Sequence, residues 1–445
     1  MASTYLTRSI SGSSGNQKKW TFSGWFKRSY IGTEQRLLTS SDNSSYDDNI
    51  RFNSDNTIEM TFNNSVVLKT NGVFRDPSFY YHIVVKVDTD QASANDRIVL
   101  YINGVDERTV GGYSTGSMPN QGVTGYINYN AFYIGVTNPS ANSKHFNGIM
   151  SHVHFTDAYA YTASSFGETD STTGEWKINV APSVTYGSNG FWILKDGNSV
   201  TDSSTNSNTF TISAGNLTKT EDNPSNVFAT INPLVGSNLM GSTVIFGNGN
   251  TNVQDPSGSA SGINPQFIST LGMPSKGKFY CELKPNSFST SSGHGIGIFR
   301  TSSGNTADVT SSSNQIRYIF ADTSIYISKY GSTDQSGLTA ISSGDIVGMA
   351  LDLDNGTLQY YVNGVARGNQ ITGVSSANDG YDYFFFANLE SSSSGRYGRY
   401  YWNFGNGYFA TTAVSSAGTN ASGIGIFEYD VPANFTALST KGLNL

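Results

Sequence analysis

The chain has a single cysteine, Cys281, among its 445 residues. One thiol cannot form an intrachain disulfide, so oxidative cross-links do not stabilise this fold. Cys281 lies in KFYCELK, where Phe279, Cys281 and Leu283 alternate with polar or amphipathic neighbours. This alternation predicts a strand with the cysteine on its buried face, as a small core residue.

Charged residues are also scarce. They make up 13% of the chain, against about 25% in an average soluble protein. The net charge is -7, and the sequence contains no cluster of lysine and arginine. A nucleic-acid-binding protein needs a positive field to follow the phosphates. We therefore expect no nucleic-acid partner.

Long apolar runs are missing as well. The N-terminal stretch MASTYLTRSISGSSGN lacks the apolar centre of a secretory signal. No apolar run approaches the roughly 20 residues that a membrane-spanning helix requires. We expect a protein made in a cytoplasm, without insertion into a membrane.

Glycine and aromatic residues are abundant, with 48 glycines and 13% aromatics. Apolar and polar residues alternate in TIEMTFN, which places Ile58, Met60 and Phe62 on one face. Glycine- and serine-rich clusters separate such segments, and no window shows a convincing helical period. The sequence therefore predicts an all-β protein with few, short helices.

One small pattern occurs twice. RIVLYINGVDERTV begins at Arg97 and LQYYVNGVARGNQI begins at Leu358. In each, hydrophobic strand residues lead into Asn-Gly and a return strand follows, and Asn-Gly favours the two-residue hairpin turn in which both residues have positive φ. We expect one such hairpin in each of two strand-rich domains, residues 1–164 and 236–430. A turn-rich linking segment, 165–235, and a short tail, 431–445, complete the predicted organisation.

Longer motifs resemble known families. FYYHIVVKVDTD followed by RIVLYINGV resembles the laminin G-like and pentraxin-like domains of the concanavalin A-like superfamily. GDIVGMALDLDNGTLQYYVNGV, with KGKFYCEL, GIGIF and YYWNFG, resembles a SPRY domain. These resemblances imply two jelly-roll β-sandwich domains with an irregular linking segment.

Further segments resemble structural proteins of tailed bacteriophages that infect marine bacteria: YLTRSISGSSGNQKKWTFSGWFKRS, SSFGETDSTTGEWKI, DNPSNVFATINPL and GIFEYDVPANFTALSTKGLN. The resemblance implies a tail fibre or adhesin on the virion surface, made in the host cytoplasm. Its expected partners are bacterial surface polysaccharide and other virion proteins. A homo-oligomer is expected, with a trimer favoured.

Two alternatives remain open. We expect the lectin-like domain to begin within the first few residues, with no room for a fibre shaft before it, which opens the alternative of a capsid decoration or head-fibre protein. A polysaccharide depolymerase is the other, but glycosidases need two carboxylates about 5–10 Å apart. No string of the E-x-D-x-E kind occurs, and Asp352 and Asp354 precede Asn-Gly, which indicates a turn. We therefore expect no enzymatic activity.

Two other motifs have weak catalytic or metal-binding readings. His152 and His154 in HVH have the spacing of metal ligands, but the glutamate that usually completes such a site is missing. GYSTG, from Gly112 to Gly116, matches a nucleophile elbow, which requires a helix after it. The loop SMPNQG follows instead, so we interpret both motifs as structural.

The remaining candidates are binding loops. SSDNSSYDDN places Asp42, Asp47 and Asp48 in one loop, a weak candidate for Ca²⁺, although a self-capping turn explains the same residues. No other cofactor is expected. Tyrosines in loops suit binding because they add contact area at a modest entropic cost. We take the following as candidate ligand-binding residues: Tyr113, Tyr126, Tyr129, Arg396, Tyr397, Arg399 and Tyr400.

Overall fold

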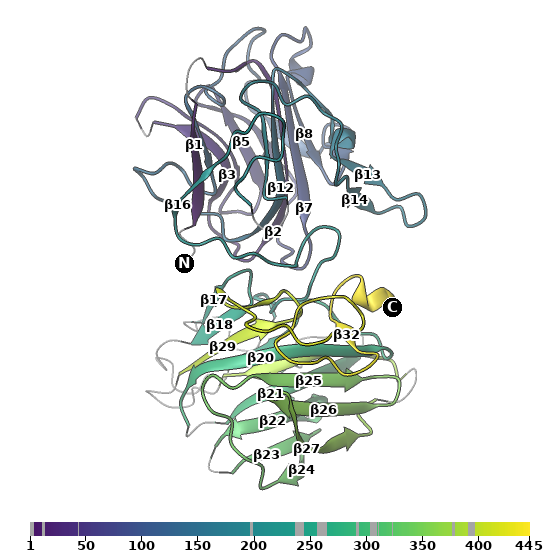
Figure 1. The fold of residues 1–445 in the computed structure, drawn as a ribbon. Helices are drawn as coiled ribbons and strands as arrows, with labels where there is room; N and C mark the ends of the chain where they lie inside the picture. The colour runs from purple at the N-terminus through teal and green to yellow at the C-terminus, as the bar shows by residue number, and fades with distance from the viewer. Residues whose placement is uncertain are drawn as a thin grey trace. The chain divides into compact units, whose positions relative to one another are not determined.

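The structure is a computed structural model, and it describes most of the chain. The described residues are 4–10, 14–42, 44–195, 199–235, 244–255, 265–290, 293–302, 309, 311–322, 324–375, 379–389 and 397–445. Within them, every helix is a 3-10 turn of three residues: Ala94–Asp96, Ala163–Ser165, Ser312–Asn314 and Gly442–Asn444. All other regular structure is β-strand, as the composition predicts (Figure 1).

Contacts divide the chain into two units, Met1–Lys219 and Thr220–Leu445. The division falls inside the segment 165–235 for which we expected a link. Its first part adds strands to the first unit, and Phe228 and Ile231 pack in the cores of the second. This turn-rich segment is therefore part of both sandwiches rather than a separate connection between them. Irregular backbone can pack against a sheet as well as link two domains.

The first unit is a sandwich of two antiparallel sheets. In order, the larger sheet contains β10 (Tyr113–Thr115), β6 (Ser65–Thr70), β5 (Ile58–Phe62), β4 (Asp47–Phe52), β3 (Gln35–Ser41), β11 (Ala131–Ile134), β1 (Tyr5–Ser9) and β16 (Thr211–Ala214). The smaller contains β15 (Phe191–Ile193), β12 (Gly148–Asp157), β2 (Lys19–Arg28), β7 (Tyr81–Asp88), β8 (Ile98–Ile102) and β9 (Val105–Asp106). Met60 from one sheet and Val85 from the other meet in a shared apolar core. A separate pair is formed by β13 (Gly167–Thr169) and β14 (Trp176–Ile178).

The second unit is also a two-sheet sandwich. One sheet contains, in order, β17 (Ile245–Gly247), β18 (Asn252–Asp255), β29 (Gly398–Asn403), β20 (Lys278–Phe288), β25 (Val347–Asp352), β26 (Thr357–Val362) and β27 (Val365–Thr372), with β32 (Thr436–Ala437) paired to β20. The other contains β19 (Gln266–Ile268), β28 (Tyr381–Asn388), β21 (His294–Ser302), β22 (Gln315–Ala321), β23 (Tyr326–Lys329) and β24 (Ser332–Ser336). A short hairpin, β30 (Tyr408–Phe409) with β31 (Thr412–Ala413), stands apart.

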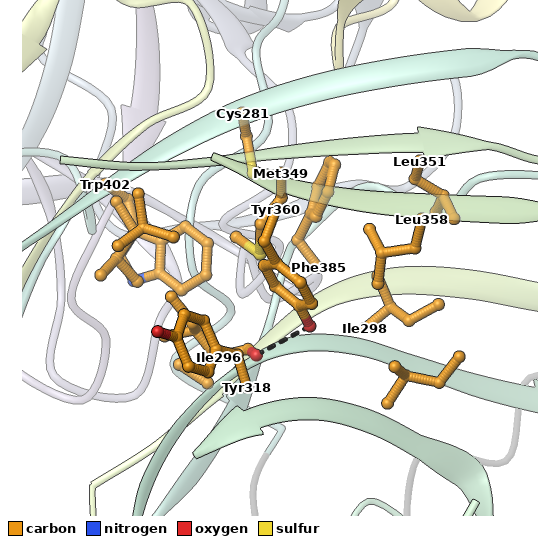
Figure 2. Close-up of a cluster of buried hydrophobic side chains, with 14 of the residues drawn as sticks. Cys281, Ile296, Ile298, Tyr318, Met349, Leu351, Leu358, Tyr360, Phe385 and Trp402 are labelled. Carbon is orange, nitrogen blue, oxygen red and sulfur yellow. Dashed lines mark hydrogen bonds between the residues drawn. The ribbon is translucent and has the colours of Figure 1, made fainter. Parts of the chain in front are cut away.

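Figure 2 shows the core between these two sheets. Cys281 and Met349 come from one sheet and Ile298 and Phe385 from the other, and all four are fully or almost fully buried. The Tyr360 hydroxyl donates a hydrogen bond of 3.1 Å to the Ile296 carbonyl, so its one polar atom is satisfied inside the core. The prediction that Cys281 is a buried core residue is confirmed.

Both predicted Asn-Gly hairpins are present. Asn103 and Gly104 join β8 to β9 with φ of 46° and 82°, and Asn363 and Gly364 join β26 to β27 with φ of 50° and 78°. In each turn the asparagine Oδ1 accepts a backbone N–H, that of His82 in β7 at 2.8 Å in one and that of Ile346, just before β25, at 2.9 Å in the other. In both units the turn therefore joins the last two strands of a run of four neighbours, β2-β7-β8-β9 in the first unit and β20-β25-β26-β27 in the second.

A later segment covers each hairpin with an aromatic ring. A β-carbon at Gly104 would overlap the Trp176 ring, and one at Gly364 would overlap the ring of Tyr429. The indole of Trp176 also donates to His82 Nδ1 at 3.0 Å, while the backbone N–H of Tyr429 donates to Glu282 Oε1 at 2.9 Å. On the outer face of each sheet, these later segments bury a polar side chain, His82 in the first unit and Glu282 in the second.

Candidate functional site

Three tyrosines of the first unit lie together where the loop between β3 and β4 meets the segment before β11. Tyr46 stacks on Tyr126 with ring centroids 4.6 Å apart, and Tyr129 meets Tyr46 edge-on at 5.6 Å. Tyr46 is buried, Tyr126 is half-buried, and 42% of Tyr129 is exposed. We call these three residues the tyrosine cluster. It presents aromatic surface to solvent while its inner ring is fixed by packing.

Asp42 holds the loop that carries Tyr46. Its Oδ1 accepts backbone N–H groups from Ser44, Ser45 and Tyr46 at 3.0, 2.6 and 3.0 Å. These hydrogen bonds, led by that from Ser44, lower the pKa of Asp42 to about 2. Asp42 is therefore a charged turn residue whose Oδ1 is committed to the backbone.

Asp48 is hydrogen-bonded to two of the segments around the tyrosine cluster. Its carboxylate accepts the N–H groups of Asn63 and Asn64 at 2.9 Å each and that of Tyr126 at 2.7 Å. Burial raises the pKa of Asp48, and the three N–H donors offset part of that rise. One carboxylate thus joins the β5–β6 turn to the loop that carries Tyr126.

A surface pocket of about 470 Å³ lies beside Tyr46. Hydroxyl and amide side chains line much of it, with two charged residues: Ser41, Ser44, Ser45, Asn64, Thr137, Ser143, Asp47 and Lys144. Asp47 pairs with Arg36 and Lys144 with Glu34, each at 3.0 Å, so the two charges are compensated. The pocket therefore offers many hydrogen-bonding groups at nearly neutral charge.

The three carboxylates proposed for Ca²⁺ do not converge. Asp42 faces its own loop, Asp47 faces Arg36, and Asp48 faces two other loops. Among the residues that the structure describes, no group of three histidine, cysteine or acidic residues could hold a metal ion. The self-capping turn that the sequence suggests for all three is present at Asp42, whereas Asp47 and Asp48 bond other segments.

The other tyrosine candidate of this unit lies apart from the cluster. Tyr113 is in β10, which pairs only with β6 at the edge of the sheet, and its ring packs against the core. The structure thus brings Tyr126 and Tyr129 together with the aspartate loop, but it leaves Tyr113 outside this site.

The candidates in the second unit are divided. Tyr397 is 43% exposed and Arg399 is half-buried on β29, whereas Arg396 lies outside the described residues. Tyr400 was placed wrongly by the sequence: its side chain has no exposed surface, and its hydroxyl bonds His294 Nδ1 at 2.9 Å and the Asn388 carbonyl at 3.2 Å. Strand alternation explains this, because Tyr400 shares a face with the core residue Trp402.

The weak catalytic motifs have structural roles. Asp352 accepts the Asn355 N–H at 2.9 Å and pairs with Lys278, as a turn residue does. Ser114 of GYSTG lies in the edge strand β10, with its hydroxyl donating to the Lys69 carbonyl. A bulge separates His152 from His154, and both rings pack against Trp192.

Comparison with known proteins agrees with this architecture in the first unit. Residues 3–165 match the family model of the concanavalin A-like lectin/glucanases superfamily. No curated protein matches the chain. None of the helices in the described ranges is long and apolar enough to cross a membrane.

Solved structures with similarity to parts of the chain include two SPRY domains and a pentraxin. The SPRY domain of human HERC1 has 15% identity and a TM-score of 0.29, covering 39% of this chain and 96% of that one. The TRIM65 PSpry domain has 16% identity and a TM-score of 0.28, covering 39% and 89%. The heptameric SAP-like pentraxin from Limulus polyphemus has 14% identity and a TM-score of 0.25, covering 36% and 71%.

Sequence reasoning missed Tyr46, although it stands inside the aspartate loop SSDNSSYDDN. A tyrosine flanked by serines and aspartates gives no sign of its direction. Its position follows from the stacking with Tyr126, which comes from a distant loop and is placed by Asp48. The aspartate loop and the two tyrosines Tyr126 and Tyr129 were predicted as separate candidates, and they come together only in the folded sheet.

Proposed function

We propose that this chain is a non-catalytic binding protein and that the tyrosine cluster with its adjoining pocket binds a glycan. The observation that carries the proposal is the combination at one edge of the first unit. An exposed aromatic surface lies beside a pocket of hydroxyl and amide groups, and the nearby carboxylates are directed at separate partners. A sugar ring packs its C–H face on an aromatic plane, while serine, threonine and asparagine bond its hydroxyls.

We further infer that the protein acts on the surface of a phage virion, as a tail fibre or adhesin that binds host polysaccharide. The phage-like segments quoted above support this role, and so does a lectin-like domain in the first unit. Single glycan sites are weak, and repeated copies on one particle strengthen attachment through effective concentration. A homotrimer would supply the first level of that repetition.

Binding to bacterial glycans tests the proposal. Purified full-length protein is assayed against a glycan array and against surface polysaccharide from marine bacteria. Tyr129→Ala and Tyr126→Ala should each weaken binding about tenfold, because each removes an aromatic contact surface. Tyr30→Ala is the matched control, since Tyr30 is 48% exposed in the same unit but lies outside the cluster.

Equal binding by all three variants would reject the tyrosine cluster as the site. Binding to capsid or tail components alone would replace the adhesin with a decoration protein. Release of reducing sugar from the polysaccharide by the wild-type chain would contradict the non-catalytic role.

A further inference from the structure

A second pocket in the first unit is built by the residues that follow β14. It measures about 600 Å³, and its lining includes Pro182, Val184, Tyr186, Trp192, Ser204 and Asn206. None of the residues that line the pocket beside Tyr46 lines this one. These residues belong to the segment 165–235, for which the sequence predicts a link and no binding site.

Two aromatic side chains in this pocket are held in a stack. The His154 ring lies 5.0 Å from the ring of Trp192, nearly parallel to it, and 6.1 Å from the ring of Tyr186. The Tyr186 hydroxyl and His154 Nδ1 are 2.9 Å apart and share a hydrogen bond. Both aromatic residues are more than nine-tenths buried, so each presents a fixed edge to the pocket.

The polar wall of the pocket is also fixed by dedicated hydrogen bonds. The Asp202 carboxylate accepts the backbone N–H groups of Trp192 at 2.8 Å, Ser204 at 2.8 Å and Asn208 at 2.7 Å. The Asn206 amide donates to the carbonyls of Gly187 and Gly190, which closes the loop against the preceding turn. Because these hydrogen bonds fix the wall, little further ordering is needed for a ligand to bind.

The indole N–H of Trp192 has no hydrogen-bond partner among the described residues, and the nitrogen is shielded from solvent. Trp20 and Trp402 share this property, but those two indoles are completely buried within cores. Trp192, by contrast, is among the residues that line this pocket. A buried donor without a partner is costly, so the Trp192 indole N–H is an unsatisfied group beside this pocket.

We propose that this pocket is a second saccharide-binding site, in which a sugar residue contacts Trp192 and Tyr186 and its hydroxyls bond the wall formed by residues 203–206. A sugar is the class that matches both surfaces, because it combines an apolar C–H face with closely spaced hydroxyls. The Lys195 ammonium lies over the Trp192 ring, 4.5 Å from its centre, and so covers part of the indole outside the pocket lining. The site goes beyond the tyrosine cluster and makes the first unit bivalent for one polysaccharide.

The test follows the Trp192 indole directly by NMR of the full chain labelled with ¹⁵N-indole tryptophan. The chain has 5 tryptophans, and the resonance that disappears in Trp192→Phe is that of Trp192. The probes are hexoses, N-acetylhexosamines and hexuronates, each added as the free monosaccharide. At least one should shift the Trp192 resonance with saturation and leave that of Trp402 unchanged.

Thr205→Phe fills the pocket from its exposed rim and should weaken the saturable shift about tenfold or more. Thr201→Phe is the matched control, since Thr201 is exposed on the same loop but does not line the pocket. If no probe moves the Trp192 resonance, or if Thr205→Phe binds as the control does, the proposal is wrong. The shift should survive in Tyr129→Ala, so this site and the tyrosine cluster can fail separately.

Discussion

The two units solve the same packing problem with different chemistry. Each carries an Asn-Gly hairpin whose glycine lies under an aromatic ring, Trp176 in one and Tyr429 in the other. Beneath that cover the first unit buries His82 and the second buries Glu282, both without exposed surface. Both units share the covered Asn-Gly turn, so this turn belongs to the common architecture. The buried polar residue differs between them, so the architecture does not determine its identity.

Glu282 is the more demanding of the two groups. Its carboxylate accepts the N–H groups of Glu428 and Tyr429 at 2.9 Å each, the Asn403 amide at 3.2 Å and the Tyr280 hydroxyl at 3.3 Å. All four donors are neutral, so the charge is balanced by dipoles rather than by a cation. Glu282 therefore supplies the hydrogen bonds that attach the segment around residue 428 to β20, beside the packing of Phe427 on Tyr280.

The largest effect should come from removing that side chain. Glu282→Ala leaves two backbone N–H groups and the Tyr280 hydroxyl without their acceptor and removes one of the two acceptors of the Asn403 amide, and it should lower the free energy of unfolding by about 3 kcal/mol or more. Hydrogen exchange at Glu428 and Tyr429 should accelerate with it. Unchanged protection of these two amides would contradict the attachment.

The hairpin glycines should give the next largest effect. Gly104→Ala and Gly364→Ala each force a β-carbon into positive φ and into an aromatic ring. We expect a loss of about 2–3 kcal/mol for each, since the backbone contributes about 1–2 kcal/mol and the overlap adds to it. Urea unfolding measures both.

Gly32→Ala and Gly380→Ala are the matched controls, because these glycines have φ of 79° and 76° and a β-carbon there would meet nothing within 4 Å. They should lose only the backbone share. Similar losses at all four positions would show that the aromatic covers do not press on the turns.

The response to pH should separate the units by sign. Burial lowers the pKa of His82 to about 3, so the first unit loses stability as the pH falls below the ordinary value of about 6.5. Burial raises the pKa of Glu282 to about 7, so the second unit gains stability as the pH falls from about 7 toward 4.5.

Between pH 6.5 and 5.5, His82 and Glu282 should each contribute a change of about 1 kcal/mol, in opposite directions, and His154, whose pKa burial also lowers, adds to the loss in the first unit. Hydrogen exchange resolved by peptide and corrected for its intrinsic pH dependence reads the two units within the intact chain. Glu282→Gln should remove the response of the second unit alone. A shift of the same sign in both units would contradict the assignment.

Local chemistry made the sheets and turns predictable. The Asn-Gly turns, the alternating strands and the buried Cys281 follow from rules that act within a few residues. The same alternation puts Glu282 on the polar face of its strand, and that assignment is correct. Its burial could not be predicted, because the segment that covers it comes from residues 428 and 429, far along the chain.

The candidate sites show the same division. Tyr126 and Tyr129 were predicted from composition, whereas Tyr46 and the pocket around Trp192 depend on long-range contacts. Tyr400 was misplaced because a run of Arg and Tyr residues conceals which of them face the core. Period-two alternation from Trp402 would have assigned it to the interior.

The carboxylate of Asp48 sets a limit on how this protein can diversify. It fixes the turn at Asn63 and Asn64 and the loop at Tyr126 at once, so lengthening either segment would pull amides away from a shared acceptor. New preferences are therefore more accessible by exchanging the side chains that stand on these loops than by remodelling the loops. Under the proposed glycan-binding function, variants of this protein with altered specificity should differ at positions such as 129 and keep an acid at 48.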